Sequence, residues 1–147
     1  MNEVKNEDNP QFWDSMYKAG EAAWDLGGPT PLFKDLVKQI PKGELIVIGC
    51  GNGHDAITFA KTGFNVTAVD FAPSAIKNLR KATKVEGVKI KILEQDIFSL
   101  TRKYQYKFKY IIEQTCFCAI HPSRRKEYEQ LVKNLLKPNG LLIGLWF

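Results

Sequence analysis

Gly49, Gly51 and Gly53 stand at alternate positions directly after an apolar run, in the stretch IVIGCGNGHDA. A tight turn from strand to helix needs glycine where φ is positive, and one glycine would satisfy that need. Three alternating glycines predict more, namely a ligand that lies against the backbone beside the amides of a helix N-terminus. The spacing is not the dinucleotide fingerprint, because His54 replaces its third glycine. No Gly-Lys-Ser/Thr of a phosphate-binding loop follows either.

Two carboxylates follow these glycines, each at the end of a predicted strand. Asp70 closes the segment NVTAVD and could accept both hydroxyls of a ribose, or cap the helix that starts at Pro73. Asp96 could accept from the amino group of an adenine, with Ile97 against the ring, or simply begin a turn. The three features in this order predict a nucleoside ligand. They do not by themselves separate NAD from S-adenosylmethionine, although the missing third glycine disfavours NAD.

The apolar spacing predicts alternating strands and helices that would position these residues. The run Leu45–Ile48 is apolar throughout, as expected for a strand buried on both faces of a parallel sheet. We predict one α/β domain with an open, mostly parallel sheet and helices on both faces. Its strands would span 44–48, 65–71, 88–93, 108–113 and 141–147, and its helices 32–40, 54–63, 73–83 and 123–136, with Pro138 to Gly140 ending the last helix. Ligands of such sheets bind outside the carboxyl ends of the strands.

The composition is that of one ordinary globular domain. The chain has 147 residues, of which 44% are hydrophobic and 25% charged. No apolar run approaches the roughly 20 residues of a membrane span, and the polar N-terminus resembles neither a signal nor a transit peptide. We therefore expect a cytoplasmic protein with no membrane partner. The odd count of 3 cysteines fits a reducing compartment.

Neither the charge nor the cysteines predict another kind of site. The net charge is +5, but the lysines are scattered, so we expect no nucleic-acid partner. Cys116, Cys118 and His121 could offer three zinc ligands, but no fourth completes the set, so no metal is predicted. Arg124 and Arg125 begin a helix and could face either an anionic acceptor or solvent.

The motifs together resemble a known family. GCGNG, the strand-ending Asp70 and QDIF at 95–98 resemble a class I S-adenosylmethionine-dependent methyltransferase. The segments FWDSMYKAGEAAWDLGGPTPLF and CFCAIHPSRRKEY are similar to those of the thiopurine S-methyltransferase-like family, which includes thiol and halide methyltransferases. These two segments are more specific than the glycines. The resemblance covers about residues 12–147.

The resemblance implies a Rossmann-like methyltransferase domain with an N-terminal helical lid over about residues 10–30. It implies that S-adenosylmethionine is the cofactor and that a small molecule is the acceptor. In the family, two further strands follow the position that matches Phe147. Without them, the fifth strand, LLIGLWF, would be an exposed edge open to self-association. The resemblance implies that Trp13 and Trp24 flank the cofactor, that Gly49 and Gly51 lie against its methionine part, that Asp70 holds the ribose, that Asp96 and Ile97 hold the adenine, and that Gln114 lies beside the donor. The predicted cofactor site also includes Asn52 and Phe71.

The predicted function is methyl transfer to a small soft nucleophile, such as a thiol, a thiopurine-like compound or a halide. The leaving group is neutral, and a thiolate or halide needs no base, so positioning and desolvation would supply most of the rate. Asp25 or Glu113 could take a proton from a neutral thiol, and Gln114 is the other candidate catalytic residue. The alternatives are a cofactor-binding but catalytically incomplete fragment and an NAD-dependent oxidoreductase. Methylation of amino groups in nucleic acid or protein is disfavoured, because Glu113 to Cys116 lack the Asn/Asp-Pro-Pro-Tyr/Phe tetrapeptide.

Overall fold

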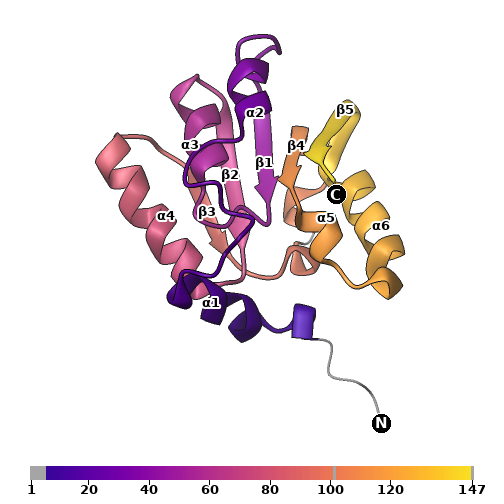
Figure 1. The fold of residues 1–147 in the computed structure, drawn as a ribbon. Coiled ribbons are helices and arrows are strands. Elements are labelled where there is room, and N and C mark those ends of the chain that lie inside the picture. The colour runs from indigo at the N-terminus through magenta and orange to yellow at the C-terminus, as the bar shows by residue number, and fades with distance from the viewer. Residues whose placement is uncertain (1–5, 101, 147) are drawn as a thin grey trace.

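A five-stranded sheet forms the centre of the fold, in the order β3-β2-β1-β4-β5 (Figure 1). The computed structural model describes residues 6–100 and 102–146, so Phe147, predicted in the fifth strand, lies outside them. Each pair of neighbouring strands is parallel, which confirms the predicted open α/β sheet. The strands are β1 (Glu44–Ile48), β2 (Asn65–Asp70), β3 (Lys91–Glu94), β4 (Phe108–Gln114) and β5 (Leu136–Leu145).

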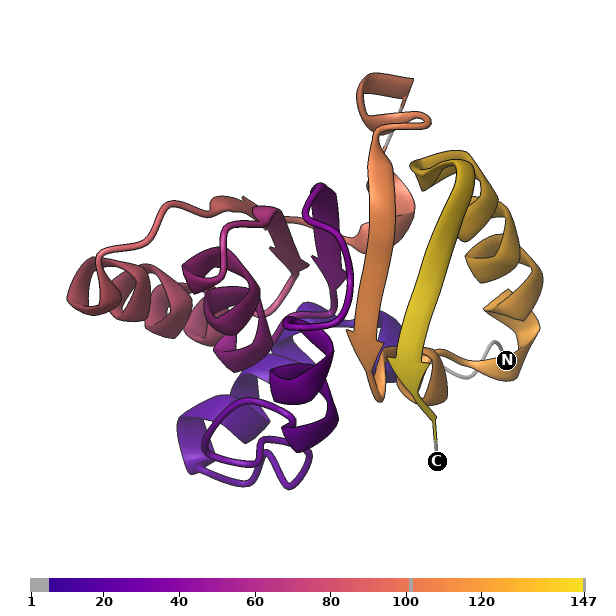
Figure 2. The same cartoon turned by 90° about the horizontal axis from the view of Figure 1, so that it is seen from above.

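Helices cover both faces of this sheet, as the view from above shows (Figure 2). Leu45 and Val47 of β1 pack in one apolar core with helices α2 (Pro31–Leu36), α3 (His54–Lys61) and α4 (Pro73–Glu86). Ile46 and Ile48 pack in the other core with α6 and the short 3-10 segments. Burial on both faces explains the unbroken apolar sequence of β1. The helices are α1 (Pro10–Ala19), α2 (Pro31–Leu36), α3 (His54–Lys61), α4 (Pro73–Glu86), α5 (Cys116–Ala119) and α6 (Arg125–Leu135), with 3-10 turns η1 (Asn6–Asp8), η2 (Ile97–Ser99), η3 (Arg102–Tyr104) and η4 (Pro122–Arg124).

Several boundaries differ from the prediction. Helix α4 runs on to Glu86, because Gly87, at φ +66°, supplies the left-handed residue that ends it. Strand β3 starts only at Lys91, where pairing with Thr67 of β2 begins. The four-residue helix α5 was not predicted at all.

The end of the last helix was also predicted wrongly. Helix α6 stops at Leu135 and β5 follows at once, so Pro138, Asn139 and Gly140 lie inside the strand. The register between β4 and β5 shifts at this point, and Asn139 has a φ of +66°. The turn-forming residues therefore mark a bulge in a strand.

Strand β5 lies at one edge of the sheet and pairs with β4 alone. Leu141 is 53% exposed and Trp146 is 48% exposed on this segment. The prediction of an exposed apolar edge is confirmed, whereas self-association through it stays a prediction. In the parts of the chain that the structure describes, no helix is both long and apolar enough to cross a membrane.

Helix α1 lies beside the carboxyl end of the sheet, toward which β1 points (Figure 1). It is attached to the start of α4, because the amide of Ser74 donates to Asp14 Oδ1 at 2.6 Å. Lys18 forms an ion pair with the same carboxylate at 3.0 Å. Within the predicted lid of about residues 10–30, the helix itself ends at Ala19, followed by Gly20 in a left-handed cap. That this segment acts as a lid stays a prediction.

Candidate functional site

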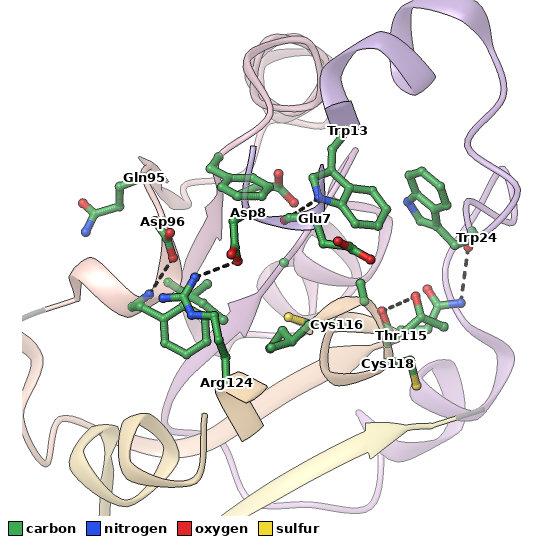
Figure 3. Close-up of a pocket in the computed structure, with 18 of the residues that line it drawn as sticks. Glu7, Asp8, Trp13, Trp24, Gln95, Asp96, Thr115, Cys116, Cys118 and Arg124 are labelled. Carbon is green, nitrogen blue, oxygen red and sulfur yellow. Dashed lines mark hydrogen bonds and ion pairs between the residues drawn. The ribbon is translucent and has the colours of Figure 1, made fainter. Parts of the chain in front are cut away.

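A cavity of about 330 Å³ lies at the carboxyl ends of four strands (Figure 3). The segment that precedes and includes α1 covers it from the other side and contributes Glu7, Asp8 and Trp13. Since successive strand ends meet here, residues far apart in sequence line one space. The strand ends contribute Gly49 after β1, Asp70 and Phe71 after β2, residues 95–98 after β3, and residues 114–116 at and after β4.

The three glycines do not all serve the cavity. Each has a positive φ, at +60° for Gly49, +54° for Gly51 and +82° for Gly53, so the turn needs three glycines rather than one. Of the three, Gly49 lines the cavity, and a Cβ there would lie 2.9 Å from Cys116 Sγ. At Gly53 a Cβ would overlap the side chain of Leu79. The interpretation that a ligand explains all three glycines is therefore wrong, since packing against α4 explains Gly53.

Asp70 joins the end of β2 to the glycine loop. Its side chain is 8% exposed, and its Oδ2 accepts from the amide of Gly51 while Oδ1 accepts from that of Ala72, each at 2.9 Å. Burial raises the pKa of this carboxyl, and the backbone hydrogen bonds oppose that rise. A carboxylate has about four acceptor positions, so it retains room for ligand hydroxyls. Asp70 thus holds the turn before α4 but does not cap that helix, whose N-cap residue is Ala72. Its contact with a ligand stays a prediction.

Asp96 and Ile97 follow β3 at the same edge of the cavity. Asp96 Oδ1 accepts from the amide of Phe98 at 2.9 Å, which is the ordinary turn considered from the sequence. Ile97 is buried and packs in the second core cluster, yet it also lines the cavity. The predicted pair is therefore brought to the cavity, and its contact with an adenine stays a prediction.

Aromatic side chains of the N-terminal segment form one wall. Trp13 and Trp24 meet edge to face, with ring centroids 5.4 Å apart. The indole of Trp13 donates to the carbonyl of Glu7 at 2.9 Å, and that of Trp24 donates to Tyr17 Oη at 2.9 Å. Both tryptophans line the cavity, as does Tyr17, which the sequence analysis missed. Burial, followed by the charge of Asp70, raises the pKa of Tyr17.

Asp25 lies outside the main cavity, although it was a candidate base. It accepts from the amide of Gly27 at 2.7 Å and from the side chain of Asn52, and its Oδ1 lies 3.0 Å from His54 Nε2. Burial acts to raise the pKa of Asp25, but these hydrogen bonds and His54 outweigh it and lower the pKa. Asn52 also accepts from Asn78 at 3.0 Å. Asp25 and Asn52 line a neighbouring space of about 40 Å³ instead.

Gln114, at the end of β4, lies between the main cavity and the smaller neighbouring space. Gln114 lines the main cavity and the smaller one, and its Nε2 donates to the carbonyl of Trp24 at 3.4 Å. The neighbouring Glu113 is fully buried and does not line the cavity. Its Oε2 accepts from the amide of Cys116 at 2.8 Å, and Oε1 accepts from Tyr128 Oη at 2.5 Å. The hypothesis that Glu113 takes a proton is therefore unsupported, since these bonds make it an anchor for α5.

Arg124 closes one side of the cavity. Its guanidinium lies 4.0 Å from the ring centroid of Phe98 and forms ion pairs with Asp8 at 2.8 Å and Glu127 at 3.1 Å. The hydrogen bond to Glu127 raises the pKa of Arg124 above its ordinary value, although burial acts to lower it. The sequence left open whether Arg124 faces an anionic acceptor or solvent; in the structure it lines the cavity and is paired with two carboxylates of this chain. Within residues 6–100 and 102–146, no three potential metal ligands gather at one point.

A parallel α/β sheet whose strand order reverses between β1 and β4, with a cavity and acids at the carboxyl ends of successive strands, is the arrangement of a nucleoside-binding, Rossmann-like domain. The family description "Thiopurine S-methyltransferase" matches residues 8–146. The chain therefore belongs to the thiopurine S-methyltransferase family, as the resemblance indicated.

Individual relatives agree with this family. "Probable thiol methyltransferase 2" of Arabidopsis thaliana is 34% identical and covers 98% of this chain and 65% of that protein. "Thiocyanate methyltransferase 1" of Brassica oleracea is 34% identical and covers 92% of this chain and 61% of that protein. A solved structure from work on converting a disulfide into a thioacetal in echinomycin biosynthesis superposes with a TM-score of 0.81 at 26% identity. The match covers 90% of this chain and 58% of that one. The chain thus spans less than two thirds of the length of these relatives.

Proposed function

We propose that this domain binds S-adenosylmethionine in the cavity and transfers its methyl group to a small soft nucleophile. The observation that carries the proposal is the joint placement of Gly49, Asp70 and Asp96 on one cavity of about 330 Å³, at the ends of three adjacent strands. That size is within the usual range of about 300–1,000 Å³ for small-ligand sites. Family membership supports the same ligand.

The lining suits the parts of this cofactor. Asp70 would accept from the ribose hydroxyls, and apolar Phe71 and Ile97 would hold the adenine, with Asp96 at its amino group. Trp13 and Trp24 lie on the wall toward the end of β4, where Gln114 would sit beside the donor sulfur. When bound, S-adenosylmethionine supplies a methyl group on a positively charged sulfur.

The protein's own task in such a transfer is to orient the acceptor and exclude water. The departing sulfide is neutral, so no acid is needed to protonate it. Asp25 and Glu113 are held by several hydrogen-bond donors, which leaves them poorly placed to accept a proton. We favour a small-molecule acceptor over a nucleic acid, because the described lining contains more carboxylates than basic groups.

Incubation of the purified protein with S-adenosylmethionine and a panel of thiols, with product detection by mass spectrometry, tests this function. We expect an S-methylated product and an equal amount of S-adenosylhomocysteine. Cofactor binding without any methylated product would favour the catalytically incomplete alternative. Oxidation or reduction of NAD in place of methyl transfer would contradict the proposal.

A further inference from the structure

We infer that Glu7 accepts the proton of the methyl acceptor, and that the acidic cavity selects a neutral thiol over an inorganic anion. This inference rests on the proposed function and names its substrate class. In the portion of the chain that the structure describes, the lining carries four carboxylates and one guanidinium, namely Glu7, Asp8, Asp70, Asp96 and Arg124.

Three of these carboxylates are already engaged. Asp70 accepts from two backbone amides at the turn after β2. Asp96 accepts from the amide of Phe98 and holds the turn after β3. Asp8 is in an ion pair with Arg124, whose other nitrogens reach Glu127. Each of the three therefore has a structural partner that a proton would displace.

Glu7 is different, because the described residues provide no hydrogen bond or ion pair to its carboxylate. Only its main chain is fixed, since its carbonyl accepts from the indole of Trp13 at 2.9 Å. Figure 3 shows its side chain directed into the cavity, below Trp13 and toward the side where Thr115 lies. A carboxylate held at its backbone and free at its oxygens is suited to accept a proton from a bound molecule. Glu7 is also exposed, so the proton can pass on to water.

The charge balance of the cavity fixes the kind of acceptor. The positive charge of Arg124 is compensated by Asp8 and by Glu127. The remaining lining charges, on Glu7, Asp70 and Asp96, are negative, and they repel an anion such as thiocyanate or a halide. A neutral thiol avoids this repulsion but carries a proton, which must leave during the transfer. The free carboxylate of Glu7 meets that need.

The acceptor sulfur forms a bond to the methyl carbon, and the bond from that carbon to the donor sulfur breaks, with its electron pair staying on the donor sulfur. As the new bond forms, positive charge builds on the acceptor sulfur and its S–H becomes strongly acidic. A carboxylate, although a weak base, can then take the proton. The products are a methyl sulfide, S-adenosylhomocysteine and a protonated Glu7, which releases its proton to water.

The test compares Glu7→Gln with Glu21→Gln, which removes the same charge from an exposed residue of the N-terminal segment outside the cavity. With 2-mercaptoethanol at pH 7, we expect Glu7→Gln to lose roughly 100-fold in kcat/KM and Glu21→Gln to retain the wild-type value. As the pH approaches the thiol pKa, near or above about 8.5, thiolate forms in solution and Glu7→Gln should recover. A purely structural role for Glu7 would give no such recovery.

A binding measurement accompanies the kinetics. Equilibrium dialysis of labelled thiocyanate against the protein loaded with S-adenosylhomocysteine should show weak binding to the wild type and about tenfold tighter binding to Glu7→Gln. The inference would be overturned if the wild type bound or methylated thiocyanate as well as it binds or methylates the thiol. Unchanged thiol transfer in Glu7→Gln, or binding of S-adenosylhomocysteine with transfer to no thiol, would also overturn it. Failure of the wild type to bind S-adenosylhomocysteine would instead overturn the proposed function itself.

Discussion

Replacement of Asp70 by asparagine separates the structural role of this carboxylate from its role toward a ligand. Its two oxygens accept from the amides of Gly51 and Ala72, and the residue is 8% exposed. An asparagine can accept one of these hydrogen bonds, but its NH₂ group faces the other donor. One buried N–H is then left unpaired, which costs about 1–3 kcal/mol of stability.

The same substitution should weaken binding of S-adenosylhomocysteine. A hydrogen bond to a charged group contributes about 1.5–3 kcal/mol, which corresponds to a loss of roughly 10- to 150-fold in affinity. Urea unfolding would measure the stability and calorimetric titration the dissociation constant. Since burial raises the pKa of Asp70, we also expect wild-type affinity to fall with decreasing pH before an ordinary aspartate would protonate.

Asp14 provides the matched control. It is 6% exposed and accepts from the amide of Ser74 at the start of α4, the helix that follows Asp70. It does not line the cavity. Asp14→Asn should therefore lose similar stability with less than about a threefold change in affinity. Equal loss of affinity in the two variants would mean that Asp70 acts only through the fold and makes no contact with the ligand.

Further predictions concern the elements that hold the cavity. Gly51→Ala should lose about 1–3 kcal/mol in urea unfolding, because its φ is +54° and the new Cβ would lie 2.6 Å from Tyr17 Oη. Gly28→Ala, where nothing lies within 4 Å, should lose less than about 1 kcal/mol. Glu113→Gln should lose about 2–3 kcal/mol, because an amide cannot accept from all its buried donors. Below about pH 4 the wild type should lose the part of its stability that the ionised Asp25 contributes, because the pKa of Asp25 is lowered in the folded protein.

The sign of the acid effect follows from that lowered pKa. The contribution of Asp25 is present above its unfolded pKa of about 3.9 and disappears as the pH falls through the lower folded value. Asp25→Asn should therefore show a shallower loss of stability below about pH 4 in urea titrations. An identical slope in the variant and the wild type would contradict this. If Glu113→Gln were as stable as the wild type, the hydrogen bonds of Glu113 would not anchor α5.

Much of the fold could be predicted because it depends on local patterns. The boundaries of β1 were predicted at Glu44 and Ile48, since a run buried on both faces is apolar and ends in a turn. The acids after β2 and β3 reach one cavity because parallel strands carry their carboxyl ends to the same edge. By contrast, Pro138 and Asn139 misled the prediction, since such residues occur in strand bulges as well as in turns.

The rest of the site depends on contacts between distant residues. Asp25 was considered as a base, but its partners Asn52 and His54 lie 27 and 29 positions away, and only the fold brings them to it. Likewise Arg124 reaches Asp8 across 116 positions. Glu7 had no periodic or motif signal at all, so its place in the cavity could be found only from the structure.

Calorimetric titration of the purified chain with S-adenosylhomocysteine, with NAD as the control ligand, shows whether the cavity at the carboxyl ends of the strands is the site of a methyltransferase cofactor. We expect one site with a dissociation constant on the order of micromolar, about −8 kcal/mol, weakened in Asp70→Asn and without detectable binding of NAD. Binding of NAD with equal affinity, or binding of S-adenosylhomocysteine that Asp70→Asn leaves unchanged, would contradict the account.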